Sequence, residues 1–538
     1  MVDKKQTKYI FVLGGVMSGL GKGIAAASIG YLLKQAGVKV TIMKLDPYLN
    51  VDPGTMNPYQ HGEVFVLDDG SETDLDLGHY ERFIDVNMTK NNNATSGQIY
   101  STVLEKERKG EYLGDTVQVI PHVTDEIKNR IRKLNNDGNY EVVICEVGGT
   151  VGDIESLPFM EAIRQLSLEV GYHNHMLVHV TLLPFIKASG ELKSKPTQHS
   201  VMKLREIGLS PDMILCRSEH EIEQSVRDKI ALFCNVRSDH VIEGRDVPSI
   251  YEVPLVMHEQ NAGHLIKERL KIKKTPKLKK LRSFIENYKN PKNQVTIAMC
   301  GKYTELIDSY KSVMESFVHA GVENNARVNI KWVKTEKIKS NVSAEKEFEG
   351  VDGILLLPGF GSRGVEGKVR SSKYARDTNT PFLGICLGLQ CAVIDYARNV
   401  CGLTDANSTE FNKKTKHAVI DLMESQKAIK IKGGTMRLGA YDCDILPGTK
   451  IFKAYRKNKI SERHRHRFEV NNKYKKILEK NGLTFSGVNS DLGVVEAVEI
   501  SDHPWYVASQ FHPELKSRVN KAHPLFRDFI KATIKNKS

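Results

Sequence analysis

The chain has 538 residues, 40% of them hydrophobic and 27% charged, and a formal net charge of +13 at pH 7. This composition excludes a disordered protein, and the length exceeds the roughly 250–300 residues at which a single core stops growing, so we expect two large domains. The eight cysteines include no CxxC pair, which argues against a disulfide framework and against a structural zinc site.

The positive charge has two interpretations: a nucleic-acid-binding surface, or a lysine-rich surface with several sites for small anions. We favour the second, because no nucleic-acid-binding motif accompanies the charge; "ERHRHRFEV" at 462–470 is the best local exception. The apolar runs fall far short of the ~20 residues that cross a bilayer, and the first residues lack the layout of a signal peptide. We therefore expect a cytoplasmic protein with no membrane or nucleic-acid partner.

The first half of the chain alternates apolar runs with helical segments. From Tyr9 an apolar run ends in glycines, a segment of helical composition follows at 22–35, and a second apolar run comes next. Near-continuous apolar runs recur at 140–149, 174–184 and 211–218, as expected for parallel strands covered on both faces. These runs predict a doubly wound α/β domain.

The stretch "GGVMSGLGKG" at 14–23 lies between the first predicted strand and the first predicted helix. Such a turn directs backbone N–H groups and the positive end of a helix toward an anion, and Lys22 can reach the β- and γ-phosphates of a nucleotide. The usual loop reads GxxxxGK[ST], but here five residues separate Gly15 from Gly21, and Gly23 replaces the hydroxyl residue that binds magnesium. We therefore predict a phosphate site whose metal is held by carboxylates from elsewhere.

Two acids are candidates for holding that metal. Glu146 ends an apolar strand and precedes two glycines, where an acid projects from the carboxyl end of a parallel strand. Asp76 belongs to the acidic stretch at 68–83, which on its own indicates only a solvated surface loop. Mg²⁺ prefers oxygen ligands and keeps several waters, so two protein carboxylates suit it.

A lysine-rich stretch divides the chain. Residues 267–292 carry two prolines and little apolar periodicity, which predicts a linker with at least one helical turn; a basic arm for nucleic acid is the alternative. We place the first domain at 1–270, the linker at 271–294 and the second domain at 295–538.

A new alternation of strands and helices after the linker predicts a second α/β domain. Within it, "PFLGICLGLQ" places Cys386 between an apolar strand and a helix, framed by Gly384 and Gly388. Small residues there allow the sharp turn of a nucleophile elbow, and a helix N-terminus favours the thiolate. "YVASQFHPE" adds His512 as a candidate base and Glu514 as a group that could orient it.

Several long motifs resemble the CTP synthase family, whose members convert UTP to CTP. They are "GGVMSGLGKG", "MKLDPYLNVDPGTMNPYQHGEVFVLDDGSETDLDLGHYERF", "EVGGTVGDIESLPF" and "KSKPTQHSV", and the likeness is dense over most of residues 8–260. The cysteine elbow with its distant histidine and glutamate resembles the class I glutamine amidotransferases. The resemblance implies an α/β protein of two doubly wound domains, an N-terminal P-loop amidoligase of the dethiobiotin synthetase type and a C-terminal class I glutamine amidotransferase.

The resemblance also implies roles for residues of the first domain. Lys22 would contact the phosphates of ATP, and Asp76 and Glu146 would hold Mg²⁺. The implied ATP-binding residues are Gly19, Leu20, Gly21, Lys22, Gly23, Ile24, Asp76, Arg245, Asp246 and Val247. The implied UTP- and CTP-binding residues are Ser18, Asp153, Ile154, Glu155, Lys193, Ser194, Lys195, Pro196, Thr197, Gln198 and Lys229, of which 153–155 would contact CTP as an inhibitor.

For the second domain the resemblance implies that Cys386 attacks the amide of glutamine, His512 protonates the departing ammonia and Glu514 holds the imidazole. The implied glutamine-binding residues are Gly359, Leu387, Gly388, Leu389, Gln390, Glu410 and Arg467. One departure stands out, because the family usually has PGGFG before the elbow and this chain reads "LPGFG", with Pro358 in place of the first glycine. Proline has no N–H, so an oxyanion-hole donor at this position is lost.

The implied reaction converts UTP, ATP and L-glutamine or ammonia into CTP, through phosphorylation of the uracil 4-oxygen. GTP activation, CTP inhibition, homotetramers, filaments in some members and a sheltered route for ammonia are further implications. Two alternatives are a cobyrinate-type amidotransferase, which gives no reason for "KSKPTQHS", and a P-loop scaffold protein with decayed sites, against which the intact site residues argue.

Overall fold

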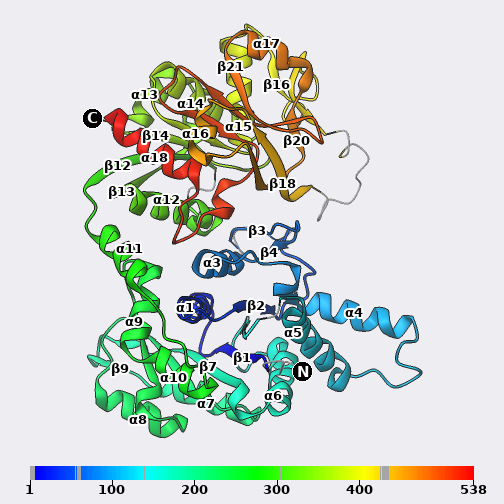
Figure 1. The fold of residues 1–538 in the computed structure, drawn as a ribbon, viewed down its shortest axis with the longest axis vertical. Helices are drawn as coiled ribbons and strands as arrows, with labels where there is room; N and C mark the ends of the chain where they lie inside the picture. The colour runs from blue at the N-terminus through cyan, green and yellow to red at the C-terminus, as the bar shows by residue number, and fades with distance from the viewer. Residues whose placement is uncertain are drawn as a thin grey trace. The chain divides into compact units, whose positions relative to one another are not determined.

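The computed structural model describes residues 6–54, 56, 62–138, 140–302, 305–423, 426 and 436–537, so part of the motif "MNPYQHGEVF" lies outside the described residues. The chain forms two compact units (Figure 1). The first unit comprises Met1–Pro53 and Asp76–Ile285, and the second comprises Gly54–Leu75 and Glu286–Ser538. Residues 54–75 therefore belong to the second unit although they lie in the first half of the sequence. Among the described residues, no helix combines the length and apolar character needed to cross a membrane.

The first unit contains a seven-stranded sheet in which each strand is parallel to its neighbours. Across the sheet the strands are β11 (Val241–Arg245), β10 (Met213–Ser218), β7 (His175–Leu182), β1 (Lys8–Gly14), β6 (Val142–Val147), β2 (Val40–Asp46) and β5 (Asn93–Thr95). Tyr9, Phe11 and Leu13 of β1 enter one core cluster, while Ile10 and Val12 between them are also buried. Both faces of the sheet are thus covered, which confirms the prediction drawn from the apolar runs.

Helices cover both faces of this sheet (Figure 1). They are α1 (Lys22–Gln35), α3 (Leu75–Ile84), α4 (Ser96–Arg108), α5 (Thr124–Gly138), α6 (Leu157–Val170), α7 (Lys195–Glu206), α8 (Gln224–Cys234), α9 (Val253–Glu259) and α10 (Ala262–Leu270). The short strands β8 (Phe185–Ile186) and β9 (Glu191–Leu192) form a hairpin. The connection from β1 to α1 carries the predicted phosphate-binding glycines, Glu146 lies near the end of β6 and Asp76 lies in the first turn of α3.

The second unit contains a nine-stranded mixed sheet. Its strands are, in order, β13 (Ala326–Lys334), β12 (Asn293–Gly301), β14 (Gly353–Leu356), β15 (Phe382–Ile385), β23 (Tyr506–Ser509), β22 (Val494–Ile500), β21 (Leu483–Asn489), β18 (Arg437–Ile445) and β19 (Lys459–His466). The pairs from β13 to β23 are parallel, and those from β23 to β19 are antiparallel. The α/β class is confirmed, and the antiparallel half is an addition that the sequence patterns did not predict.

Two core clusters cover the parallel half of this sheet. Ile354 and Leu356 of β14 enter one cluster, and Leu355 enters the other. The helices of the unit are α12 (Lys311–Glu323), α13 (Asn341–Phe348), α14 (Val365–Asp377), α15 (Leu387–Asn399), α16 (Lys450–Tyr455), α17 (Lys475–Lys480) and α18 (Pro524–Lys537). A second small sheet consists of β16 (Ala406–Ser408), β17 (His417–Leu422) and β20 (Phe468–Val470), and β3 (Phe65–Val66) pairs with β4 (Glu72–Thr73).

The lysine-rich stretch contains helix α11 (Lys279–Lys289), and the boundary between the units falls within this helix. Leu281, Phe284 and Ile285 are buried on it, while most of its other side chains are exposed. The i, i+3, i+4 spacing of these three residues makes one apolar face, which is why the segment is helical despite its high charge.

Candidate active sites

The loop between β1 and α1 is held by backbone hydrogen bonds to two neighbouring segments. The Gly15 N–H donates to the Val180 carbonyl at 2.9 Å, and the Val151 N–H donates to the Gly14 carbonyl at 2.7 Å. Gly21, the residue just before α1, has a φ of 83°, a conformation that favours glycine. The additional residue in the loop is therefore accommodated without loss of the strand–loop–helix order that phosphate binding requires.

Lys22 is the first residue of α1, and its side chain is buried against the loop. Its Nζ donates to the Gly149 carbonyl at 2.5 Å, and a Cβ built on Gly14 would lie 2.6 Å from Lys22 Cδ. Burial lowers the pKa of Lys22, and Glu146 is the strongest influence that raises it. The ammonium group thus lies at the loop, where the sequence predicts the phosphates.

Position 23 has no room for a side chain. A Cβ built on Gly23 would lie 2.1 Å from Asp76 Oδ1 and 3.4 Å from Glu146 Oε2. The Asp76 carboxylate therefore occupies the space into which the hydroxyl residue of the usual loop would project. The structure brings both predicted acids to the first turn of α1.

These two acids share a lysine. Lys44 Nζ lies 3.1 Å from Glu146 Oε1 and forms a second ion pair with Asp76. Burial raises the pKa of Glu146, and Lys44 opposes that shift. Among the described residues, no third His, Cys, Asp or Glu completes a metal-binding group. Two carboxylates beside a phosphate loop nevertheless fit Mg²⁺, because this ion takes its remaining ligands from water and phosphate oxygens.

A pocket beside the loop contains the residues predicted to contact the base of ATP. It is lined by Leu20, Gly21, Ile24, Ala25, Val180, Leu215, Arg217, Glu243, Gly244, Arg245, Asp246, Val247, Ile250, Val253, Val256 and Met257. Arg217 Nη2 lies 2.7 Å from Asp246 Oδ1, and this ion pair forms part of the pocket lining. The apolar lining from α1 and α9 suits a flat aromatic ring.

The residues predicted for UTP lie around the start of α7. Gln198 Nε2 donates to Ser194 Oγ at 3.0 Å, and Thr197 Oγ1 donates to the Leu182 carbonyl at 3.1 Å. Lys193 forms an ion pair with Glu191. Pro196 takes a position in the first turn of α7, where a missing N–H costs nothing.

The remaining predicted nucleotide residues are more dispersed. Lys195 lies over the ring of Phe233, 5.6 Å from its centroid, and Lys229 is exposed on α8. The carboxylate of Asp153 accepts the Thr150 N–H at 2.8 Å. Ser18, Gly19, Ile154 and Glu155 are exposed. No hydrogen bond or ion pair joins 193–198 to 153–155 in the described part of the chain. Helix α7 nevertheless approaches the second group, because a Cβ on Gly152 would lie 3.5 Å from Lys203 Cγ.

One buried pair in this unit was not predicted. His179 Nε2 and Ser200 Oγ lie 2.9 Å apart, and a Cβ on Gly15 would lie 1.6 Å from that same Ser200 oxygen. This pair links β7, helix α7 and the phosphate loop. Ser200 stands in the motif "KSKPTQHSV", but His179 sits in an apolar run and gives no signal of its own.

In the second unit, Cys386 occupies a strained turn between β15 and α15. Its φ and ψ are 54° and −103°, a backbone conformation that non-glycine residues rarely adopt. A Cβ on Gly388 would lie 2.6 Å from the Leu356 carbonyl oxygen, and one on Gly384 would lie 2.9 Å from the Gly388 carbonyl carbon. These two glycines are therefore required by close packing, and the predicted elbow geometry is present.

His512 and Glu514 form a hydrogen-bonded pair beside this cysteine. His512 Nδ1 lies 2.7 Å from Glu514 Oε1, and among the described residues Nε2 has no hydrogen-bond partner. Burial lowers the pKa of His512, but Glu514 and Cys386 outweigh it and raise the pKa to about 10. The imidazole can therefore carry a proton while one nitrogen remains available to a reacting group.

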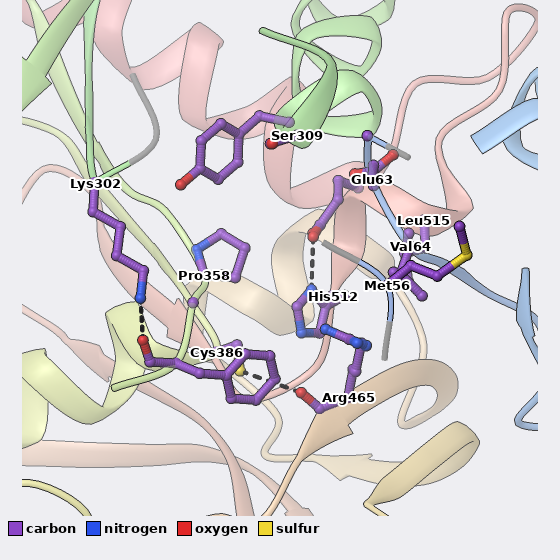
Figure 2. A pocket seen from close by; sticks show the side chains of 15 residues that line it. Met56, Glu63, Val64, Lys302, Ser309, Pro358, Cys386, Arg465, His512 and Leu515 are labelled. Atoms are coloured by element: carbon purple, nitrogen blue, oxygen red, sulfur yellow. Dashed lines mark hydrogen bonds and ion pairs between the residues drawn. The ribbon is translucent and has the colours of Figure 1, made fainter. Parts of the chain in front are cut away.

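A pocket joins these residues (Figure 2), with Cys386 and His512 both facing it. It is lined by Met56, Gly62, Glu63, Val64, Lys302, Ser309, Tyr310, Pro358, Gly359, Phe360, Cys386, Arg465, His512, Glu514 and Leu515. Gln510 Nε2 donates to Cys386 Sγ at 3.7 Å, a contact that was not predicted. The arrangement suits attack by the thiol on a small electrophile with proton transfer by His512.

The residues predicted for glutamine lie around this pocket. Gly359 lines it, and Leu387, Gly388, Leu389 and Gln390 form the first turn of α15. Gln390 Nε2 donates to the Phe468 carbonyl at 3.0 Å. Glu410 Oε1 accepts the Gly361 N–H at 2.7 Å, and burial raises its pKa. Arg467 Nη1 lies 2.5 Å from Gln426 Oε1, and Arg467 is not among the residues that line the pocket.

Comparisons with known proteins indicate the same family over most of the chain. Residues 8–272 match the family model described as CTP synthase N-terminus, and residues 305–532 match the one described as glutamine amidotransferase class-I. The CTP synthase of Caldanaerobacter subterraneus subsp. tengcongensis is 57% identical over 528 residues, which cover 98% of each chain. That of Carboxydothermus hydrogenoformans is 56% identical over 530 residues, 98% of this chain and 99% of the relative. Among solved structures, the glutaminase domain of Trypanosoma brucei CTPS with bound acivicin is 39% identical over 45% of this chain and 94% of that chain, with a TM-score of 0.43.

Proposed function

This chain belongs to the CTP synthase family, and from that premise we propose that it converts UTP, ATP and L-glutamine into CTP, ADP, phosphate and glutamate. One chain contains both a phosphate loop with two adjacent acids and a thiol pocket with a histidine–glutamate pair, and this observation supports the proposal most. A CTP synthase matches the chain over 98% of its length. We propose the domain limits 1–270 and 295–538, with residues 271–294 as linker.

The first unit would activate UTP. The uracil 4-oxygen is a poor leaving group, so a phosphoryl group from ATP is transferred to it, and phosphate then leaves when ammonia attacks carbon 4. Lys22 and the loop N–H groups would hold the triphosphate of ATP, and the pocket with Arg245 and Asp246 would take its base. Bound Mg²⁺, held by Asp76 and Glu146, would neutralise charge on the transferred phosphoryl group. Lys44 would be released toward the phosphates.

The second unit would release ammonia. The Cys386 thiolate attacks the side-chain carbonyl carbon of glutamine, His512 gives its proton to the departing ammonia, and a γ-glutamyl thioester forms. Water, deprotonated by His512, then cleaves the thioester to give glutamate and the free thiol. Glu514 holds the imidazole through Nδ1 in both steps. The Gly359 and Leu387 N–H groups are the candidate donors to the oxyanion.

The finer features carried by the family remain part of the proposal. We propose that residues 193–198, Ser18 and Lys229 bind UTP and that residues 153–155 take part in CTP inhibition. GTP would activate the glutaminase, and the chain would assemble as a homotetramer, with filaments as a further possible state. Ammonia near neutral pH is mostly protonated and then cannot attack, so its transfer should be sheltered from water.

The test measures CTP formation from UTP and ATP with Mg²⁺ in two assays, one with glutamine and GTP and one with ammonium at raised pH. We expect CTP in both, and Cys386→Ala should abolish only the glutamine-dependent reaction. Cys401→Ala, which alters a half-buried cysteine after α15 outside the pocket, is the matched control and should keep both. No CTP from either nitrogen source would overturn the proposed function.

A further inference from the structure

Lys368 of helix α14 is a buried lysine without an acidic partner. The residue is 2% exposed, and within the described part of the chain it forms no ion pair with a carboxylate. Burial lowers its pKa. A desolvated amine is costly unless a strong acceptor compensates it, and the acceptor here is the Leu357 carbonyl, 2.5 Å from Lys368 Nζ.

That carbonyl belongs to the peptide just before Pro358. A trans peptide presents its carbonyl and its N–H on opposite sides, so most peptides can be anchored through either group. The peptide between Leu357 and Pro358 has no N–H, so the Leu357 carbonyl is its single hydrogen-bonding group. Lys368 donates a hydrogen bond to that carbonyl.

Two other side chains hold the far end of the same turn. Lys302 Nζ donates to the Phe360 carbonyl, and Glu410 Oε1 accepts the following N–H, that of Gly361. Both the carbonyl and the N–H of the Phe360–Gly361 peptide thus form hydrogen bonds to side chains. The Leu357–Pro358 peptide forms one through its carbonyl, to Lys368. Gly359, between these two anchors, lines the pocket that contains Cys386.

The helix that carries Lys368 is itself fixed by close packing. Gly367, the preceding residue, lies so near the Thr335 carbonyl that an added Cβ would be 1.8 Å from its oxygen. The backbone from which Lys368 extends is therefore closely packed, so the hydrogen bond to the Leu357 carbonyl connects the turn to a fixed part of α14.

We propose that Lys368 is a positioning residue of the glutaminase site, which fixes the turn at Leu357–Pro358 and so holds Gly359 in place to stabilise the oxyanion formed on glutamine. Pro358 has no N–H through which the turn could be held in place, and the hydrogen bond from Lys368 to the Leu357 carbonyl would hold it instead. This inference rests on the proposed glutaminase function of the Cys386 pocket. It requires only that the amine donate a hydrogen bond, which it does in either protonation state.

The experiment compares Lys368→Met with wild type in four measurements: kcat and KM for glutamine hydrolysis, ammonia-dependent CTP formation, and thermal unfolding. Loss of precise oxyanion stabilisation should lower kcat about tenfold to a hundredfold and leave KM within about threefold. Ammonia-dependent CTP formation should stay unchanged, because it does not use the Cys386 pocket. The melting temperature should change little, because methionine fills the same space and removal of a desolvated amine offsets the lost hydrogen bond. Lys373→Met, on the same helix but in an ion pair with Asp377, is the control and should keep all four values.

A double-mutant cycle with Pro358→Gly tests the route of the effect. Because both changes act on one peptide, their effects on kcat should depart from simple multiplication. An unchanged kcat in Lys368→Met, equal losses in glutamine hydrolysis and in ammonia-dependent CTP formation, or multiplicative effects in the cycle would each overturn the inference. Since wild-type CTP formation from ammonia and glutamine is measured alongside, failure of the proposed function itself is seen separately.

Discussion

Asp76 Oδ1 lies 2.1 Å from the point that a Cβ on Gly23 would occupy. The usual phosphate loop has Ser or Thr at this position, with its hydroxyl on the metal ion. Here the Asp76 carboxylate, from helix α3, fills that space, so the absence of a side chain at Gly23 is what leaves room for Asp76. A hydroxyl on α1 and a carboxylate from α3 exclude each other at this point.

Gly23→Ser should therefore impair the first unit and not improve it. The serine would displace Asp76, and we expect ammonia-dependent CTP formation to fall by about tenfold or more, because a misplaced group near the reacting phosphate is costly. Gly23→Ala should lower the rate in the same way, which would show that the loss comes from the added carbon that displaces Asp76 and not from the serine hydroxyl. A rate in Gly23→Ser equal to wild type would show that the position of Asp76 does not matter.

Asp76→Asn should weaken divalent metal binding in the presence of ATP. The change keeps the shape of the side chain and removes one of the three carboxylates that form ion pairs with Lys44, the others being Glu146 and Asp46. Hard cations depend on ligand charge. Electron paramagnetic resonance of Mn²⁺ measures this directly, without reliance on turnover. Asp115→Asn, at an exposed position of the same unit, is the control; equal Mn²⁺ affinity in all three proteins would contradict a metal role for Asp76.

The strand–loop–helix units and the cysteine elbow could be predicted from the sequence because local patterns determine them. Apolar runs such as 140–149 fix buried parallel strands, and Gly384 and Gly388 frame the elbow within five residues. The antiparallel strands β18 and β21 carry a mixed pattern of buried and half-buried residues, which a local sequence pattern does not distinguish from a surface segment. The class of each unit was thus predictable, and the composition of the second sheet was not.

Long-range contacts account for what the sequence could not reveal. Lys368 looks like an ordinary helical lysine, and its role depends on a carbonyl eleven positions away that only the fold brings close. The same holds for His179, which meets Ser200 and Gly15 only after β7, α7 and β1 have packed. Residues 54–75 likewise join the second unit through contacts such as Glu63 with Ser312, at 2.6 Å between Oε2 and Oγ.

The stability contributed by His512 should depend on pH. Burial opposes its protonation, but Glu514 and Cys386 raise its pKa from 6.5 to about 10, so the folded state binds the proton more tightly than the unfolded state. The stabilisation is complete below pH 6.5 and is lost as pH rises toward about 10. The melting temperature of His512→Gln should therefore differ from wild type most at low pH and least near pH 10, whereas His417→Gln, outside the pocket, should show no such trend.

Gly15→Ala should disturb both the stability of the first unit and its handling of ATP. The new methyl group would lie 1.6 Å from Ser200 Oγ and 2.7 Å from His179 Nε2, and overpacking of this kind costs about 1–3 kcal/mol. Because α7 or the loop must shift to relieve the clash, KM for ATP in the ammonia-dependent reaction should rise as the melting temperature falls.

Ser200→Gly in the same chain supplies the decisive comparison. It removes the oxygen and the carbon nearest to the new methyl group. The double variant should therefore recover part of the lost melting temperature and part of the lost ATP affinity. The recovery in stability is incomplete, because glycine within a helix costs roughly 1 kcal/mol. Gly37→Ala, at a turn where an added Cβ meets nothing within 4 Å, is the control for stability; it should show only the modest strain of its positive φ and no change in KM. If Ser200→Gly fails to recover either quantity, the packed contact among Gly15, His179 and Ser200 is not what holds the phosphate loop in position.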